Sequence, residues 1–475
     1  MSTADQYDVL VIGSGEAGKY LAWTLSKEGH RTALVERAMV GGSCPNVACL
    51  PSKNVIHSAK VAWFGARAES FGLRVGSVSV DMPGVQRRKR RMVADLVDVH
   101  LARYDASGVE LIMGDARFVA PKTVEVTLGD GGTRTLSGEH VIVSVGTRAA
   151  IPDLPGMTDA RPMTHVEALD LDRLPGHLVV VGGGYVGLEL AQATRRLGSR
   201  VTVIERGAQL AGREDADVAA AMLDLFRDED IDVLLDADVH RVEGRSGEGV
   251  RVHVKTPHDE RIVEGTDLLI AVGRTPNTDG LGLEQAGIEV DARGYIVVDD
   301  RLETTARGVW AVGDCAGSPQ FTHVAFDDFR VAHVTINGGN RSARDRLVPY
   351  CMFTDPMLAR VGLDEAEAKA SGVGYRLATL PMSAVLRTRT LSAPRGFMKM
   401  LIDAHSDRIL GFTAFGAEAS ELLAAVQTAM LGQLPFTTLR DALFTHPTAA
   451  EGLTVLLANV PETPAAERVS RSARP

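Results

Sequence analysis

The chain carries one local pattern twice, and this duplication restricts its fold more than any other feature. Residues 7–37, YDVLVIGSGEAGKYLAWTLSKEGHRTALVER, and residues 177–206, HLVVVGGGYVGLELAQATRRLGSRVTVIER, each read as an apolar strand, a glycine turn, an amphipathic helix and a second strand. The two runs share three glycines at a constant offset of 169 positions: Gly13, Gly15 and Gly18, then Gly182, Gly184 and Gly187. This repeat predicts a protein with two α/β domains.

Each glycine turn has the residues that a dinucleotide requires. The first glycine permits a tight turn, the second lets the backbone approach a pyrophosphate, and the third lets helix and strand pack closely. The helix N-terminus then faces the phosphates. Glu36 and Glu205 end the second strands, where a carboxylate can accept hydrogen bonds from a ribose diol. Because the whole set recurs in both copies, we prefer two Rossmann-like dinucleotide-binding domains over two structural turns without ligands.

Other segments complete this organisation. VIVSVGTRAAIP (141–152) and LLIAVGRTPN (268–277) read as buried strands that close the two domains. GVWAVGDCAG (308–317) is a third apolar strand, and its Asp314 is a candidate acceptor for a sugar-like hydroxyl, whereas Cys315 is expected to pack. After about residue 346, GFMKMLIDAHSDRILGFTAFG (396–416) predicts a hairpin with a Ser-Asp turn, followed by two apolar helices. This part predicts an α+β domain that binds no nucleotide.

Cys44 and Cys49 stand five residues apart in GGSCPNVACLPSK (41–53). In a regular helix their Cα atoms would lie about 9 Å apart, beyond the roughly 4.4–6.8 Å of a disulfide. Pro45 favours the first helical position, which would make Cys44 the cap residue and Cys49 a residue of the second turn, and Pro51 would distort that helix. The spacing disfavours zinc. From spacing alone, a disulfide and two structural thiols both stay open.

Bulk properties exclude several functions. The net charge of −10 argues against general nucleic-acid binding, and the basic run Arg87–Arg91 is expected to be a solvated helix face. No run of 18 apolar residues predicts a membrane span. The first residues, MSTADQYDVLVIG, lack the features of a signal peptide, so we expect a cytoplasmic protein. The last residues, PETPAAERVSRSARP, predict a disordered tail.

Taken together, these motifs resemble the flavin disulfide reductases, that is, the class I pyridine nucleotide-disulfide oxidoreductases. This family includes dihydrolipoamide dehydrogenase, glutathione reductase and mercuric reductase. The resemblance runs over nearly the whole chain in the same order, and it is carried by Cys44-x4-Cys49-x-Pro-Ser-Lys53, both glycine turns, Val-Gly-Asp314 and His446-Pro-Thr-x-x-Glu451. It implies two Rossmann-like domains, for FAD and NAD(P), followed by a C-terminal α+β dimerisation domain.

The resemblance also implies boundaries and ligand sets. The implied parts are an FAD-binding domain with the redox cysteines (1–150), an NAD(P)-binding domain (151–272), a central FAD-contacting segment (273–345), a dimerisation domain (346–460) and the tail (461–475). The FAD set is Gly13, Gly15, Gly18, Glu36, Gly42, Ser43, Lys53, Gly114, Ala116, Ser144, Gly146, Asp314 for the ribitol, and Ala325. The NAD(P)H set is Gly182, Gly184, Tyr185, Gly187, Glu189, Glu205 and Gly273.

By the same resemblance, Cys44 and Cys49 form a redox disulfide against the isoalloxazine. Cys49 is the thiol on the flavin side, and Cys44 is the outer thiol that attacks substrate. Lys53 and Glu189 form an ion pair near flavin N5 and the nicotinamide. Tyr185 gates the nicotinamide pocket or, equally, packs after the glycine turn.

His446 and Glu451 complete the implied active site. A leaving thiolate needs a proton, and a histidine that titrates near neutrality can supply and recover it. A carboxylate on the other ring nitrogen fixes the tautomer and the basicity. In the family this dyad reaches the cysteines of the other subunit, so the resemblance implies a homodimer with shared active sites.

The substrate is the least constrained prediction. The retained His446 favours a disulfide or another oxidised sulfur compound, whereas mercuric reductases carry a tyrosine there, a C-terminal cysteine pair and often an extra N-terminal domain. GDCAGSPQF, GFMK and LRDALFTHP, however, resemble mercuric-reductase-like and reactive-chlorine-resistance proteins. Reduction of a metal ion or a reactive oxidant is therefore the alternative, and a flavoprotein that only binds partners is the third. Glu205 and Gly187 favour NADH, although Arg206 could accept the extra phosphate of NADPH.

Overall fold

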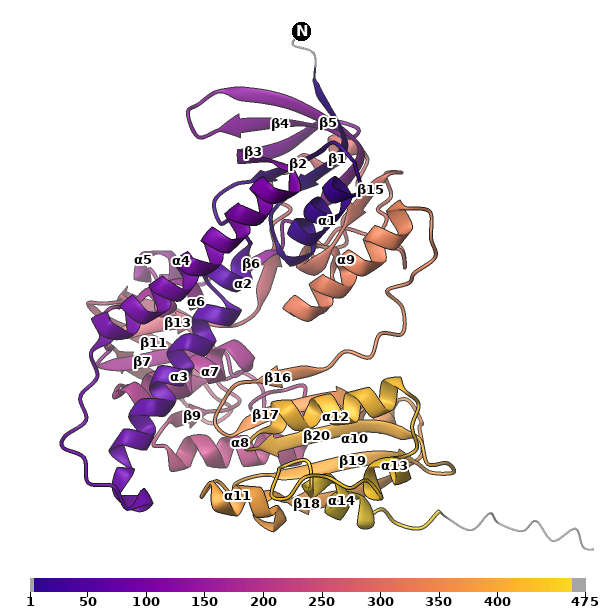
Figure 1. Ribbon diagram of the computed structural model, residues 1–475. Helices are drawn as coiled ribbons and strands as arrows, with labels where there is room; N and C mark the ends of the chain where they lie inside the picture. The colour runs from indigo at the N-terminus through magenta and orange to yellow at the C-terminus, as the bar shows by residue number, and fades with distance from the viewer. Residues whose placement is uncertain (1–3, 464–475) are drawn as a thin grey trace, which may run out of the picture. The chain divides into compact units, whose positions relative to one another are not determined.

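The computed structural model describes residues 4–463, and these divide into two compact units. The first unit comprises Met1–Ala208 and Phe226–Arg346, and the second comprises Gln209–Leu225 and Leu347–Pro475, as far as they are described. Residues 464–475 lie outside the described part, so the expected tail is not described beyond residue 463. Figure 1 shows the elements of each unit along the chain. No helix among residues 4–463 has the length and apolar character needed to cross a bilayer.

The first unit begins with the sheet that the first repeat predicts. Its strands are β1 (Asp5–Ile12), β2 (Thr32–Glu36), β3 (Glu110–Ala120), β4 (Thr123–Leu128), β5 (Thr133–Val143) and β15 (Val309–Ala311). The strand β1 pairs in parallel with both β2 and β5, and β15 extends the sheet beside β5. The strands β3, β4 and β5 form an antiparallel meander. Because both faces are covered, the central strands are apolar at almost every position.

The second repeat forms a separate parallel sheet in the order β13-β7-β8-β9. Its strands are β7 (His177–Val181), β8 (Arg200–Ile204), β9 (Asp232–Leu234) and β13 (Asp267–Ile270). An antiparallel sheet of β10 (Asp238–Arg245), β11 (Gly249–Lys255) and β12 (Glu260–Gly265) shares its apolar core. A two-stranded ribbon joins β6 (Thr147–Ala149) to β14 (Arg274–Pro276). The two predicted α/β domains are therefore confirmed.

Helices pack around these sheets. They are α1 (Glu16–Lys27), α2 (Ser43–Asn46), α3 (Cys49–Ala66), η1 (Ala68–Phe71), α4 (Met82–Ser107), α5 (Met157–Ala160), α6 (His165–Asp170), α7 (Tyr185–Leu197), η2 (Leu283–Ala286), η3 (Gly313–Ala316) and α9 (Thr322–Ile336). Most of α8 (Ala216–Asp228) belongs to the second unit. The helices α1 and α9 pack against each other over the first sheet (Figure 1).

The second unit is the predicted α+β domain. Its antiparallel sheet runs β16-β17-β20-β19-β18, with β16 (Tyr350–Met352), β17 (Met357–Gly362), β18 (Tyr375–Pro381), β19 (Phe397–Asp403) and β20 (Ile409–Gly416). The hairpin predicted in 396–416 is confirmed as β19–β20. The helical elements are α10 (Glu365–Ala370), η4 (Met382–Ala384), α11 (Leu386–Thr390), α12 (Ala419–Leu431), α13 (Phe436–Arg440) and α14 (Gly452–Ala458). Every residue of β20 is buried, because helices such as α12 cover the sheet.

A buried ionic cluster links residues 209–225 to the rest of the second unit. The Lys399 ammonium on β19 has a fully buried side chain and lies 2.6 Å from Asp215, 2.8 Å from Asp217 and 3.1 Å from Glu365. The Arg360 guanidinium on β17 pairs with Asp364 and contacts Glu214. A buried cation requires such partners, because an uncompensated charge away from water is costly.

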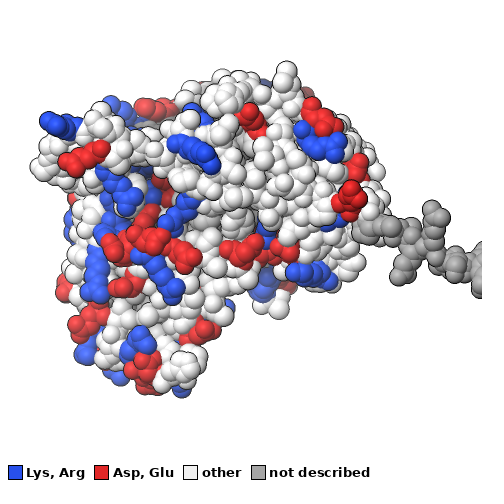
Figure 2. Space-filling model, turned by 90° about the horizontal axis from the view of Figure 1, so that it is seen from below, with Lys and Arg blue, Asp and Glu red and all other residues white. Residues whose placement is uncertain are grey.

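The basic run differs from its expectation in part. Arg87–Arg91 lie on α4 as predicted, but the Lys89 side chain is only 7% exposed, and its ammonium donates to Leu169 O at 2.7 Å and Asp170 at 2.9 Å. The expected solvated face is therefore wrong at Lys89, because α6 ends against α4 and offers an acceptor there. On the face in Figure 2, acidic and basic side chains are interspersed.

Candidate functional site

The first glycine turn is tightly closed by its own backbone. Gly13 has φ +94°, and a Cβ added to it would lie 2.4 Å from Ser144 O. A Cβ on Gly18 would lie 2.4 Å from Gly13 O, and one on Gly15 would lie 3.2 Å from Ser144 O. Side chains at these positions would therefore push the strand, turn and helix apart.

The second turn repeats this geometry. Gly182 has φ +112°, and its Cβ would lie 2.4 Å from Ala271 O, while that of Gly187 would lie 2.1 Å from Gly182 O. Gly184 is exposed, and a Cβ there would meet nothing within 4 Å, so the backbone is accessible to a ligand. Tyr185 is the first residue of α7 and is half-buried.

The acidic residue of each repeat sits beside its own turn. Glu36 accepts a hydrogen bond from the Ser14 amide at 2.9 Å, and Glu205 accepts the equivalent bond from the Gly183 amide at 2.6 Å. The two turns are thus alike in their glycines, their helix N-termini and their carboxylates. Both fit the diphosphate and ribose of a dinucleotide.

The cysteine loop forms two helices rather than one. Cys44 lies inside the single turn α2 and Cys49 begins α3, so the expectation of one helix from Pro45 is wrong. The break falls at Ala48, whose φ of −129° and ψ of −103° are not helical. Pro51 is then the third residue of α3, where its missing N–H costs no helical hydrogen bond.

This break brings the two cysteines together as unbonded thiols. The hydrogen bond from Cys44 lowers the pKa of the Cys49 thiol to about 6, and the Thr322 hydroxyl and the Lys53 ammonium act in the same direction. The same hydrogen bond, together with burial, raises the pKa of Cys44. At neutral pH, therefore, Cys49 is ionised and Cys44 keeps its proton.

Two further contacts surround the thiols. The Thr322 Oγ1 atom at the start of α9 lies 3.1 Å from Cys49 Sγ. The ion pair expected between Lys53 and Glu189 is present, with Nζ 2.6 Å from Oε2 and the Glu189 side chain 8% exposed. Sequence reasoning missed Thr322, because nothing in the order of residues links it to a cysteine 273 positions away.

The loop is also joined to the first glycine turn. Gly42 has φ +76°, and a Cβ on it would lie 2.7 Å from the Cα of Gly15. Ser43 follows as the first residue of α2. Only a residue without a side chain allows this approach, so the cysteine loop and the dinucleotide turn are held in one place.

Asp314 lies in η3, beside the two-stranded ribbon of β6 and β14. It accepts a hydrogen bond from Thr147 Oγ1 at 2.6 Å, and the Arg274 Nε atom is 3.7 Å away. Thr147 and Arg274 are polar partners that sequence reasoning missed. The other residues of the expected FAD and NAD(P)H sets are distributed over loops, a helix and a strand: Ser144, Gly146 and Gly273 lie on loops, Ala325 lies in α9, and Gly114 and Ala116 lie in β3.

The predicted dyad is assembled in the second unit. His446 Nδ1 lies 3.0 Å from Glu451 Oε2 and 3.1 Å from Oε1. The imidazole is 63% exposed, so its other nitrogen is open to solvent. A carboxylate on Nδ1 places the exchangeable site at Nε2.

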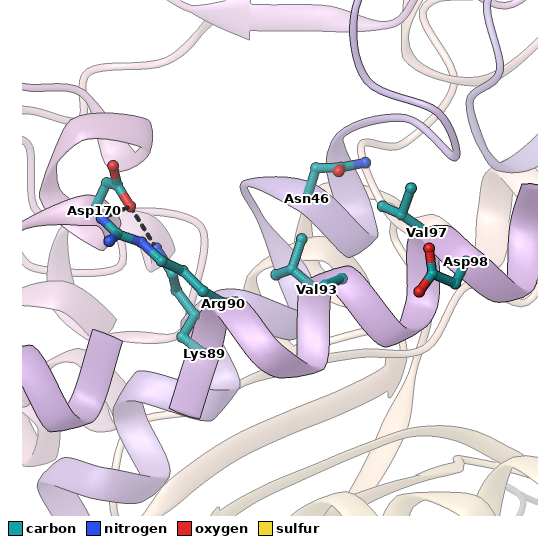
Figure 3. A pocket seen from close by; sticks show the side chains of 8 residues that line it. Asn46, Lys89, Arg90, Val93, Val97, Asp98 and Asp170 are labelled. Atoms are coloured by element: carbon teal, nitrogen blue, oxygen red, sulfur yellow. Dashed lines mark hydrogen bonds and ion pairs between the residues drawn. The ribbon is translucent and has the colours of Figure 1, made fainter. Parts of the chain in front are cut away.

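A surface cavity of about 390 Å³ lies between α2 and α4 (Figure 3). Asn46, Val93 and Val97 line it, and at one end the ion pairs of Lys89 and Arg90 with Asp170 close it. Asn46 and Cys44 are two positions apart in one helical turn, so their side chains leave the backbone on roughly opposite sides. The cavity is therefore not part of the thiol site.

Two protein families match the chain. Residues 7–328 match the family described as pyridine nucleotide-disulphide oxidoreductase, and residues 348–456 match the dimerisation domain of the same family. Together they leave out residues 1–6, 329–347 and 457–475.

Individual relatives agree with this match. A probable pyridine nucleotide-disulfide oxidoreductase, RclA of Escherichia coli, is 36% identical over 462 residues, covering 96% of this chain and 100% of RclA. A mercuric reductase of Acidithiobacillus ferrooxidans is 35% identical, covering 94% of this chain and 81% of that protein. The solved Cu(II) complex of RclA, described as an HOCl-induced flavoprotein disulfide reductase, superposes with a TM-score of 0.87 over 96% of this chain and 99% of that one, at 35% identity.

Proposed function

Because the chain belongs to the pyridine nucleotide-disulphide oxidoreductases, a family of FAD-dependent enzymes that use NAD(P)H, we propose that it reduces a disulfide or another oxidised sulfur substrate through Cys44 and Cys49. The observation that carries this proposal is the pair of thiols brought together at the break between α2 and α3, with Thr322 Oγ1 3.1 Å from Cys49 Sγ. Their mutual hydrogen bond lowers the pKa of Cys49 and raises that of Cys44, so Cys49 is the thiolate and Cys44 needs a base before it can attack. The chain would work as a homodimer, in keeping with its dimerisation domain.

The first repeat would bind FAD and the second NADH. Gly13, Gly15 and Gly18 would receive one diphosphate, with Asp314 at the ribitol, and Gly182, Gly184 and Gly187 would receive the other. When bound, FAD supplies two-electron transfer between the nicotinamide and the cysteine pair. Glu189 would hold the Lys53 ammonium in place next to this path through their ion pair of 2.6 Å.

The chain's own residues would then perform the sulfur chemistry. Cys44 loses its proton and attacks one sulfur of the substrate disulfide, which forms a mixed disulfide and releases the first substrate thiolate. The Cys49 thiolate attacks the Cys44 sulfur, which forms the Cys44–Cys49 disulfide and releases the second thiolate. Each released thiolate needs a proton, and Cys44 needs a base because its pKa is raised.

The partner subunit's His446 would be this base and acid. Glu451 accepts from Nδ1 and so leaves Nε2 to take the Cys44 proton and to return it to the leaving thiolate. The raised pKa of Cys44 supplies the reason why such a base is needed.

A second candidate is the reduction of a metal ion or a reactive oxidant. It is favoured by the likeness to a mercuric reductase and to RclA, whose solved structure holds Cu(II) and whose description names HOCl. Among residues 4–463, however, no group of three or more His, Cys, Asp and Glu side chains is arranged to hold a metal ion.

A substrate panel separates these candidates. The FAD-loaded protein with NADH would be assayed against lipoamide, oxidised glutathione, mercuric and cupric ions, a hypothiocyanite-like oxidant and a quinone. A turnover rate with at least one disulfide that exceeds the rate with the quinone supports the proposal. Turnover of the metal ions alone would overturn it in favour of the second candidate.

The same assay tests the reductant. Glu205 is held beside the second turn by the amides of Gly183 and Gly207, at 2.6 and 2.7 Å, where its charge would repel a 2′-phosphate. We expect kcat/KM to be higher with NADH than with NADPH by about tenfold or more. Better use of NADPH would mean that Arg206, and not Glu205, faces the ribose.

A further inference from the structure

The hydroxyl of Thr322 touches the sulfur that the proposed reaction keeps ionised. Thr322 Oγ1 lies 3.1 Å from Cys49 Sγ, within the range of a hydrogen bond to sulfur. When Cys49 is a thiolate, it can only accept, so the hydroxyl must donate. Thr322 lowers the pKa of Cys49 through this contact.

The position of Thr322 in its helix strengthens this contact. It is the first residue of α9, a helix of 15 residues, and the cap residue Phe321 has no side-chain acceptor for the first amides. Because Cys49 Sγ contacts the first residue of α9, it lies near the positive end of the helix dipole. The hydroxyl and the dipole both favour negative charge on Cys49.

The helix is anchored independently of the cysteine loop. Asp328 of α9 accepts a hydrogen bond from the Gly313 amide at 2.6 Å, and its other oxygen lies 2.6 Å from Arg346. Asp328 is fully buried, so this anchor is shielded from water. The hydroxyl can thus hold its place while the sulfur chemistry changes the bonds of the loop.

The donors at Cys49 change during the proposed reaction. In the dithiol state, Cys44 donates its S–H to Cys49. Once Cys44 is bonded to a substrate sulfur it has no proton, and that hydrogen bond is lost. Of the two hydrogen-bonding side chains at Cys49, the Thr322 hydroxyl alone then remains.

We propose that Thr322 is a catalytic residue that holds Cys49 as a thiolate, and that it matters most in the mixed disulfide, when Cys44 can no longer donate. This inference rests on the proposed role of the cysteine pair, but not on the identity of the substrate. It assigns Thr322 a direct contact with a reacting atom in place of a structural role at the start of α9.

The test measures the pKa of Cys49 without any substrate. In the FAD-loaded protein, the rate at which iodoacetamide alkylates Cys49 would be followed against pH, with the modified peptide identified by mass spectrometry. The background is Cys44→Ala, which removes the other donor and imitates the mixed disulfide in this respect. Thr322→Val removes the hydroxyl at nearly constant shape, Thr322→Ser retains it, and Thr335→Val makes the same change at the far end of α9.

We expect Thr322→Val to raise the alkylation midpoint by about one pH unit or more, since a hydrogen bond to a charged group is lost. Thr322→Ser and Thr335→Val should keep the parent midpoint. With Cys44 intact, the shift should be smaller. An unchanged midpoint in Thr322→Val overturns the proposal, as does an equal shift in Thr335→Val. Thr322→Ala provides a second removal of the hydroxyl should the valine variant fail to bind FAD.

The outcome is separable from that of the substrate panel. The midpoint reports the ionisation of the Cys49 thiol and needs no substrate, so it can shift even where no disulfide in the panel is turned over. Conversely, turnover of a disulfide with no shift would leave the proposed function standing and remove Thr322 from it.

Discussion

Cys49→Ser should abolish the long-wavelength charge-transfer absorption of the two-electron-reduced protein and reduce disulfide turnover to background. The absorption requires a thiolate against the flavin, and Cys49 is the thiol whose pKa is lowered, to about 6. In the unaltered protein the band should grow as pH rises through about 6, because a lowered thiol pKa means that the thiolate is present above that value. Absorption spectra of the reduced protein between pH 5 and 8 measure both effects.

Cys44→Ser is the matched control, since it makes the same change on the other sulfur. It should also stop turnover, because it removes the attacking thiol, but it should retain the band, now without prior reduction. Loss of the band in Cys44→Ser with retention in Cys49→Ser would reverse the assignment of the two thiols.

His446→Ala should lower turnover of a disulfide substrate by about 10²–10⁴-fold, the usual contribution of general acid–base catalysis. The proton of Cys44 is hard to remove because its pKa is raised, and the imidazole is the group proposed to take it. Reduction of the flavin by NADH should be unaffected, because no proton of the dyad takes part in it. Stopped-flow absorbance separates this half-reaction from steady-state turnover.

Three comparisons sharpen this result. Glu451→Ala should act in the same direction but more weakly, since it orients the imidazole from 3.0 Å away. Mercuric-ion reduction should depend far less on His446, because no thiolate leaves. Mixing His446→Ala with Cys44→Ser subunits should restore one working site per heterodimer, and failure to do so would argue that the dyad acts within its own chain.

The glycine turns were predictable because their requirements are local. A positive φ at Gly13 and the close approach of Gly18 to Gly13 O concern residues that are near in sequence, and the second repeat reproduces both. The His446–Glu451 contact was expected from the family resemblance, and the structure shows the two side chains 3.0 Å apart.

What could not be predicted depends on distant partners. Pro45 suggested one helix, but the backbone at Ala48 departs from helical angles, so Cys49 begins a new one. Lys89 is buried only because α6 ends beside it. Thr322 contacts Cys49 from a helix that Asp328 anchors to Gly313. The contact between Thr322 and Cys49 could not be predicted from their spacing in the sequence.

The buried cluster at Lys399 makes the C-terminal domain less portable than its continuous sequence suggests. Residues 348–456 match the dimerisation domain by themselves, yet two of the three carboxylates at Lys399, Asp215 and Asp217, come from a strip more than 100 positions upstream. A fragment cut before residue 347 would lose Asp215 and Asp217 and leave the Lys399 ammonium with Glu365 as its remaining carboxylate in this cluster. The C-terminal domain can therefore be exchanged between relatives, by recombination or by design, only together with residues 209–225.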